Sequence, residues 1–132
     1  YRTVTGTDIS GEMIRQAQER MKDTNVVLFE TDGQTVPLPD EVVDVAFSYL
    51  VFQHIKTYKM VRKNFENIYR SLKPGGIFKV LLRTDPQKSM DAWWAGVHYD
   101  ITLAWCLYSP IGYKLIKSEQ VKTYAMWLWL QK

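Results

Sequence analysis

Short apolar runs alternate along this chain with segments of helical periodicity, and this alternation limits the possible folds more than any other feature. The runs at residues 3–7, 26–29, 42–49 and 77–82 are predicted strands, and those at 26–29 and 42–49 look covered on both faces. A helix is predicted after Ser10, which can cap its first turn, because Met13, Ile14, Ala17 and Met21 recur at helical spacing. Strands that alternate with helices need crossover connections, and these build a parallel sheet. The sequence therefore predicts an α/β fold, a mostly parallel sheet with helices on both faces.

Residues 57–72 contain the clearest helical pattern of the chain. Their apolar positions fall on one stripe, at Tyr58, Val61, Phe65, Ile68, Tyr69 and Leu72. The four residues that follow, Lys73, Pro74, Gly75 and Gly76, end this helix, because proline cannot continue it and glycine permits a left-handed exit.

The C-terminal part of the chain has a different order of elements. Apolar positions keep helical spacing from Met90 to Tyr108, which predicts a further helix. Residues 113–117 and 121–130 are predicted strands, joined by a polar turn at Ser118, Glu119 and Gln120. So short a connection predicts an antiparallel hairpin.

Composition and charge are those of an ordinary globular domain. With 132 residues the chain can bury a core, so residues 1–132 are predicted to form a single domain. The net charge of +3 is too small and too scattered to indicate nucleic-acid binding. We find no apolar run long enough to span a membrane and no secretory signal pattern, and we expect the single Cys106 to be a buried thiol. These features favour a cytoplasmic protein.

Several chemistry-bearing residues follow the predicted strands. In an open parallel sheet, ligands bind beyond the carboxyl ends of the strands, so Asp8, Asp32, Gly33 and residues 48–54 should share one rim. An acid in the position of Asp8 can accept hydrogen bonds from both hydroxyls of a ribose, with Ile9 and Met13 as apolar contacts for an adenine ring. The alternative role for Asp8 is to assist Ser10 in capping the helix.

Asp32 and Gly33 together suit recognition of the edge of an adenine. The carboxylate would accept a hydrogen bond from the exocyclic amine, and the glycine would bring a backbone amide close. The alternative is a simple Asp-Gly turn with no ligand.

At this point the chain resembles a family, the class I, Rossmann-like S-adenosylmethionine-dependent methyltransferases, and in particular the group that acts on small molecules. The resemblance extends over residues 3–84 and rests on four segments: Thr-Asp-Ile-Ser at 7–10, Phe-Glu-Thr-Asp-Gly at 29–33, the run at 43–55 and Leu-Lys-Pro-Gly-Gly at 72–76. It implies S-adenosylmethionine as the cofactor and methyl transfer to a small-molecule acceptor. It also implies that Asp8 binds the ribose, Ile9 and Met13 flank the adenine, and Asp32 and Gly33 read its edge.

The resemblance adds candidates for the rest of the site. Tyr49 would line the cleft, and His54 matches a histidine that approaches the acceptor in this family, although a structural histidine at a helix start is an alternative. Trp93, Trp94 and Tyr99, together with His98, are acceptor-site candidates by location only, and core packing explains their spacing equally well. No residue is named as catalytic, and no metal site is predicted.

The sequence departs from the family at one point. The family's first strand and the glycine-rich loop that approaches the methionine end of the cofactor have no counterpart in residues 1–132, so we expect a domain truncated at its N-terminus relative to the family. In the family this strand lies at the centre of the sheet, and its absence would leave two strand edges unpaired. A segment upstream, direct closure of the flanking strands, or a strand from another copy would fill the gap. We expect a homo-oligomer if the chain is complete.

The same departure leaves two other functions open. A non-catalytic binding or interaction module that self-associates is the first alternative to methyl transfer. The second is a nicotinamide-dependent enzyme, because Asp8 would serve the ribose of a dinucleotide equally well.

Overall fold

The computed structural model describes residues 2–85, 96–121 and 124–132. Contacts within the chain define two compact units, Tyr1–Pro37 and Leu38–Lys132. Among the described residues, no helix is long and apolar enough to cross a membrane.

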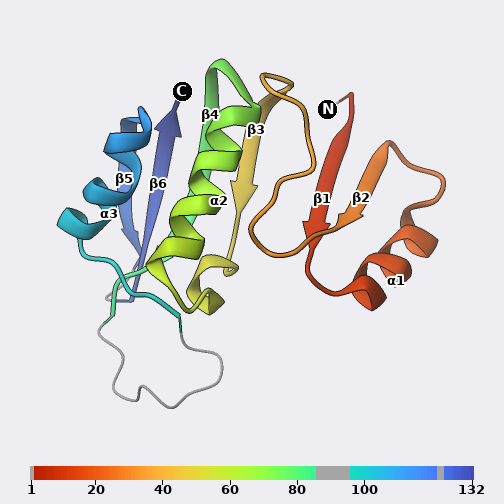
Figure 1. Ribbon diagram of the computed structural model, residues 1–132, viewed down its shortest axis with the longest axis horizontal. Helices are drawn as coiled ribbons and strands as arrows, with labels where there is room; N and C mark the ends of the chain where they lie inside the picture. Colours follow the sequence, from red (N-terminus) through yellow and green to blue (C-terminus); the bar gives the residue numbers. More distant parts are fainter. Residues whose placement is uncertain (1, 86–95, 122–123) are drawn as a thin grey trace. The chain divides into compact units, whose positions relative to one another are not determined.

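The first unit consists of strand β1 (Val4–Asp8), helix α1 (Gly11–Met21) and strand β2 (Val26–Glu30) (Figure 1). The two strands pair in parallel, with Val4 opposite Val26 and Asp8 opposite Glu30. Helix α1 begins as predicted, because the Ser10 hydroxyl accepts a hydrogen bond from the Met13 amide at 3.3 Å.

The second unit contains a four-stranded sheet in the order β3-β4-β6-β5. Its strands are β3 (Val43–Ser48), β4 (Leu72–Arg83), β5 (Lys114–Val121) and β6 (Ala125–Gln131). Strands β3 and β4 run parallel, whereas β6 is antiparallel to both β4 and β5. This mixed sheet confirms the predicted α/β class and the antiparallel C-terminal strands.

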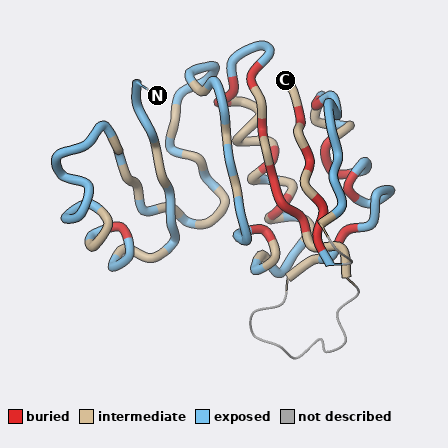
Figure 2. Tube along the Cα trace, turned by 180° about the vertical axis from the view of Figure 1, so that it is seen from behind, coloured by how far each residue is buried: buried red, intermediate tan, exposed pale blue. Residues whose placement is uncertain are grey.

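Helices α2 (Tyr58–Ser71) and α3 (Ile101–Tyr108) pack on the second unit's sheet, together with the short helices η1 (Phe52–His54) and η2 (Ser109–Ile111) (Figure 1). Alternate residues of β4, namely Phe78, Val80 and Leu82, are fully buried in the core that these helices cover. Figure 2 shows that most buried positions belong to this unit. Among the described residues of the first unit, Ile14 is the only buried hydrophobic side chain.

An aromatic cluster forms the centre of this core. The ring of Phe65 on α2 meets that of Phe78 edge to face at a centroid distance of 5.1 Å, and that of Phe52 at 5.3 Å. Tyr113 joins the cluster, and its buried hydroxyl donates a hydrogen bond to the Phe65 carbonyl at 3.0 Å. This bond connects the start of β5 to α2 and satisfies the polar atom of a buried side chain.

Three sequence-based predictions were wrong in detail. The residues Ser118, Glu119 and Gln120 do not form a turn but belong to β5, which continues to Val121. The helix predicted from Met90 to Tyr108 begins, within the described residues, at Ile101, and residues 86–95 lie outside them. Cys106 is exposed rather than buried, because it lies on the outer side of α3.

The absence of the family's first strand would leave two strand edges unpaired. Among the described strands, β1 pairs with β2 alone and β3 with β4 alone, so each of the two has one edge without a strand partner. The absence of the family's first strand stays a prediction.

The chain leaves β3 through an unusual backbone conformation. Leu50, two residues after the strand, has a φ of +59°, in the left-handed region that side chains bearing a Cβ disfavour. The next residue, Val51, has an ordinary φ of −83°. Strained backbone of this kind is concentrated at functional sites and costs about 1–3 kcal/mol.

We expect Tyr113→Phe to lower the free energy of unfolding by about 1 kcal/mol, because it removes one buried hydrogen bond and little volume. It should also change how the free energy of unfolding depends on pH under alkaline conditions. Burial raises the pKa of Tyr113 above its usual value of 10.0, so the folded protein holds this proton more tightly than the unfolded chain. The contribution is complete below about pH 10 and is lost as the pH rises further. Urea unfolding at neutral and alkaline pH measures both effects, and an unchanged alkaline slope in the variant would contradict the assignment.

We expect Leu50→Gly to change the free energy of unfolding by less than about 0.5 kcal/mol, because relief of the left-handed strain offsets the added flexibility of glycine. Val51→Gly is the matched control, and it should cost about 1 kcal/mol because no strain is relieved there. The two side chains are similarly accessible, at 40% and 56% exposed. Equal losses in urea unfolding would show that Leu50 is not strained.

Candidate cofactor-binding site

The predicted site residues are divided between the two units. Asp8, Ile9, Met13, Asp32 and Gly33 belong to the first unit. Tyr49, His54 and Tyr99 belong to the second.

Asp8 ends β1, and backbone bonds fix its position. The Asp8 carbonyl accepts a hydrogen bond from the Thr31 amide at 2.9 Å, which joins the carboxyl ends of β1 and β2. One carboxylate oxygen, Oδ1, accepts from the Ser10 amide at 2.8 Å. The side chain therefore has the helix-assisting geometry of the alternative role, yet it remains exposed. Among the described residues, the other oxygen, Oδ2, has no hydrogen-bond partner, so the carboxylate retains the capacity to accept further donors.

Ile9 and Gly33 are brought together by the loop that follows β2. A Cβ placed on Gly33 would lie 3.1 Å from Ile9 Cγ2, so the absence of a side chain allows the two residues to approach closely. Gly33 has a φ of +75°, which glycine adopts without strain. Ile9 is 71% exposed and Met13, four residues further on, is 56% exposed. The side chains of Ile9 and Met13 are thus available for contact with a ligand, as is the nearby Asp8 carboxylate in the same unit.

The carboxylate of Asp32 organises its own loop. Its Oδ1 accepts from the Gln34 and Thr35 amides at 2.9 and 2.6 Å, and its Oδ2 accepts from the Thr35 hydroxyl at 3.0 Å. These backbone hydrogen bonds lower the pKa of Asp32, so the group is ionised at neutral pH. The Gly33 amide donates to the Thr31 hydroxyl at 3.2 Å. The loop thus has the internal bonding of the turn that was the alternative, and Asp32 is a fixed negative charge beside Gly33.

Glu30 is a second acid at this edge that the sequence analysis did not single out. It lies opposite Asp8 in the parallel register. A Cβ on Gly11 would lie 2.5 Å from Glu30 Oε2, so the Glu30 carboxylate occupies the space beside the start of α1. A negative charge there interacts favourably with the helix dipole. The register that pairs the two acids could not be read from either strand alone.

In the second unit, Tyr49 follows the carboxyl end of β3 and is held by an aromatic contact. Its ring stacks on Trp127 of β6, with a centroid distance of 5.8 Å and an interplanar angle of 14°. The ring of Phe47 also stacks on Trp127, with a centroid distance of 5.8 Å and an interplanar angle of 23°. Tyr49 nevertheless remains exposed, so one part of its ring is available to a ligand.

The acceptor-site candidates have different surroundings. His54 ends η1 and is exposed, with its Nε2 atom 3.0 Å from Gln53 Nε2. Tyr99 is fully buried in the hydrophobic core, and burial raises the pKa of its hydroxyl, which favours a packing role. Trp93 and Trp94 lie outside the described residues, and His98 is exposed.

Known proteins are similar to this chain in sequence and in fold. A family model described as a methyltransferase domain matches residues 1–80. Phosphoethanolamine N-methyltransferase 2 of Caenorhabditis elegans is 39% identical over 82 residues, which cover 60% of this chain and 18% of that protein. Malonyl-[acyl-carrier protein] O-methyltransferase of Serratia marcescens is 33% identical over 92 residues, which cover 68% of this chain and 34% of that protein. The chain therefore spans about a third or less of the length of these two curated relatives.

A solved structure extends the likeness of fold to nearly the whole chain. The S-adenosylmethionine-dependent methyltransferase of Mesorhizobium loti superposes with a TM-score of 0.80 at 16% identity, covering 99% of this chain and 81% of that one. From the match over residues 1–80 together with this Rossmann-like fold, the chain belongs to the methyltransferase domain family.

Proposed function

We propose that this domain binds S-adenosylmethionine and takes part in transferring its methyl group to a small-molecule acceptor. The observation that carries the proposal is the exposed Asp8 carboxylate at the end of β1, beside the close pair of Ile9 and Gly33. Family membership supports the reaction class, and the local geometry supports the adenosine part of the cofactor site.

Asp8 is proposed to bind the ribose. Vicinal hydroxyls are two donors, and a carboxylate can accept both through its two oxygens. Oδ1 is held in place by the Ser10 amide, which fixes the orientation of the group before the ligand arrives. Little side-chain freedom is then lost on binding.

Ile9 and Met13 are proposed to contact the adenine ring. Both are apolar and exposed, and covering them with a flat apolar ring removes their surface from water. Asp32 would place a negative charge near the exocyclic amine, and Gly33 would leave room for the ring edge. The Asp32 carboxylate already accepts three hydrogen bonds, so its part in binding is that of a prepositioned acceptor with spare lone pairs.

The reaction itself requires mainly placement. When bound, the cofactor would supply a sulfonium-bound methyl group for transfer to a lone pair of the acceptor, and the electrons of the broken carbon–sulfur bond would remain on sulfur. Tyr49 offers an aromatic face that favours a cation nearby, and His54 is an exposed residue that we assign to the acceptor side of the site. In this proposal the methionine end of the cofactor is held by a glycine-rich loop of the family's type, to which no residue of this chain is assigned.

The acceptor is proposed only by class. Of the two relatives, one is named for N-methylation of phosphoethanolamine and the other for O-methylation of malonyl-[acyl-carrier protein]. The acceptor atom therefore varies among proteins with this domain. We also propose that residues 1–132 act as one domain and that the protein works in the cytoplasm.

The comparisons give no support to the alternative of a non-catalytic module. A direct test is isothermal titration calorimetry of the chain with S-adenosylmethionine, adenosine and NADH. We expect S-adenosylmethionine and adenosine to bind with similar affinity, because the assigned contacts are all to the adenosine part. NADH contains the same adenosine group, so we expect it to bind no more tightly than adenosine, since nothing in the assigned contacts recognises its nicotinamide. The absence of heat with both adenosine compounds would overturn the proposal, and a preference for NADH would favour the nicotinamide-dependent alternative.

The role of Asp8 can be tested with a variant that keeps the local fold. Asp8→Asn retains an oxygen for the Ser10 amide but removes the charge and one acceptor. We expect its affinity for adenosine to fall about 10- to 100-fold, the cost of losing a charge-assisted hydrogen bond. Glu30→Gln is the matched control, since Glu30 lies directly opposite in the register, and it should change the affinity less than about threefold. Equal losses in calorimetry would show a general charge effect rather than a specific contact.

A further inference from the structure

We propose that this domain forms a two-fold dimer in which β5 pairs antiparallel with β5 of a second copy, centred on Ser118. The pairing would join the two four-stranded sheets into one continuous sheet. Three features of the surface favour this pairing: the open edge of β5, the charges along it and the apolar patch beside it.

Strand β5 is the outer strand of the second unit's sheet. Among the described strands it pairs with β6 alone, and along its length from Lys114 to Gln120 every residue is exposed. An edge strand presents a row of backbone donors and acceptors that a further strand can pair with. Its pairing with β6 shifts register between Leu115 and Lys117 and is regular from Lys117 to Val121. The proposed centre at Ser118 lies in this regular part.

The charges on β5 are self-complementary about that centre. The Lys117 ammonium lies 2.8 Å from the Glu119 carboxylate, so both side chains are on the same face of the strand. In an antiparallel pair centred on Ser118, each Lys117 lies opposite Glu119 of the second copy. The four groups then alternate in sign around the two-fold axis. Centring the pair one residue away, on Lys117 or on Glu119, would place like charges directly opposite each other, which disfavours those registers.

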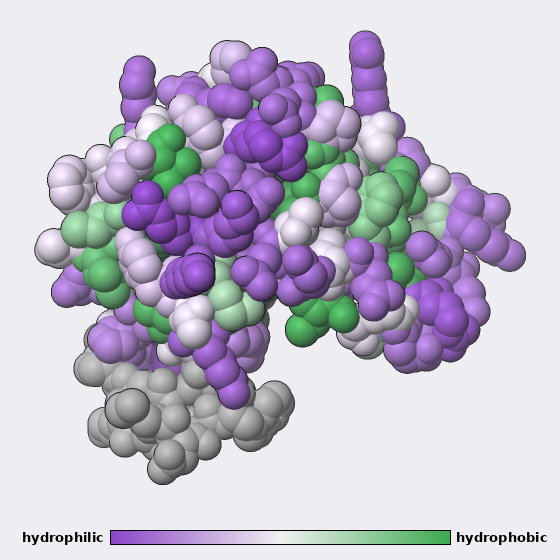
Figure 3. Space-filling view, viewed as in Figure 1, coloured by the Kyte–Doolittle hydropathy of each residue, from purple (hydrophilic) through white to green (hydrophobic). Residues whose placement is uncertain are grey.

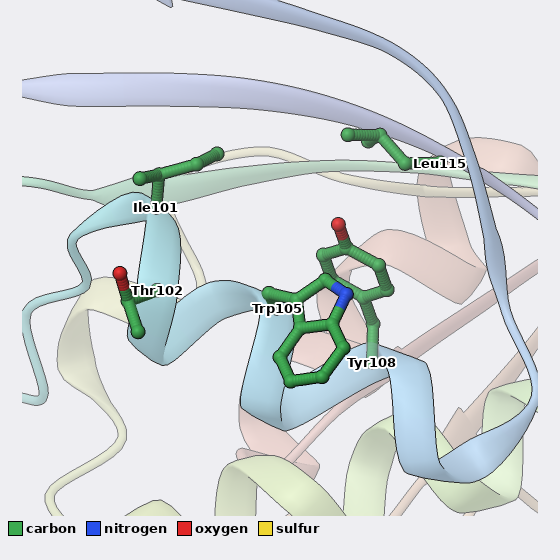
Figure 4. A pocket seen from close by; sticks show the side chains of 5 residues that line it. All are labelled: Ile101, Thr102, Trp105, Tyr108 and Leu115. Atoms are coloured by element: carbon green, nitrogen blue, oxygen red, sulfur yellow. The ribbon is translucent and has the colours of Figure 1, made fainter.

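An apolar patch beside the edge would be covered in the same dimer. Helix α3 contains no charged residue, and Ile101 and Trp105 are exposed on it. Figure 3 shows hydrophobic side chains, in green, among paler ones at the left of the view, where Figure 1 draws α3. With Thr102 and Tyr108 of the same helix and Leu115 of β5, they line an open pocket of about 280 Å³ (Figure 4). The pocket thus lies directly at the edge strand.

The symmetry brings the two patches to the same side of the joined sheet. A two-fold axis perpendicular to the sheet exchanges the copies without exchanging the faces of the sheet. The two α3 helices therefore flank the new strand pair on one face, and each apolar patch borders the other copy. Buried apolar surface and a short ladder of backbone hydrogen bonds would together stabilise this interface. This surface is separate from the open edges of β1 and β3.

The test is sedimentation velocity of charge variants at micromolar concentrations. We expect the unmodified chain to sediment as a dimer, and Lys117→Glu and Glu119→Lys each to sediment as monomers, because each places four like charges around the axis. An equimolar mixture of the two variants should restore the dimer, because every acid then faces a lysine. The double variant with both exchanges should also be a dimer. Lys63→Glu, which changes an exposed lysine of α2, is the matched control and should remain a dimer.

Trp105→Ser tests the patch independently of the charges, and we expect it to raise the dimer dissociation constant at least about tenfold. Circular dichroism verifies that each variant is folded, which is expected because all the changed side chains are exposed. A monomeric unmodified chain, single variants that dimerise like the unmodified chain, or a mixture that stays monomeric would each overturn the proposed interface.

Discussion

The second unit depends on strand β4, which is hydrogen-bonded along both edges. It pairs in parallel with β3 and antiparallel with β6, and its residues Phe78, Val80 and Leu82 are fully buried under the helices. Because backbone groups of β4 pair with strands on both sides, its alternate apolar side chains can be buried without leaving those groups unpaired. The position of β3, and with it that of Tyr49 and His54 beyond its end, follows from this pairing. Any change that displaced β4 would therefore displace Tyr49 and His54 as well.

Helix α2 shows why part of this fold could be predicted from sequence. Its apolar stripe predicted residues 57–72, and the helix runs from Tyr58 to Ser71, because burial against β4 requires one continuous apolar face. The C-terminal hairpin shows the limit of prediction from sequence. Ser118, Glu119 and Gln120 looked like a turn because they are polar, yet they form part of β5, an edge strand exposed along nearly its whole length. In such a strand, polarity no longer distinguishes strand from turn, so the hairpin was predicted but its turn was misplaced.

Part of the candidate site could likewise be predicted from the sequence, and part could not. Asp8 and Gly33 were identified because both follow short strands, and ligands bind beyond the carboxyl ends of the strands of a parallel sheet; the structure brings Gly33 against Ile9. Glu30 beside Asp8 could not be identified, because its position depends on the register between two strands. The left-handed conformation of Leu50 could not be predicted either, because leucine does not favour that region. Local chemistry could thus be predicted, whereas features set by pairing between segments could not.

The high aromatic content of the chain, with 5 Trp, 8 Tyr and 5 Phe, is used on both faces of the second unit's sheet. The covered face holds the cluster around Phe65, which stabilises the fold. The opposite face carries Tyr49, Trp127 and Trp129, with the Lys79 ammonium 4.6 and 4.7 Å from the centroids of the two indole rings. A cation between two tryptophans holds both rings in place. Because Tyr49 stacks on one of these rings, the order of this second cluster fixes a residue that the proposed function places beside the cofactor.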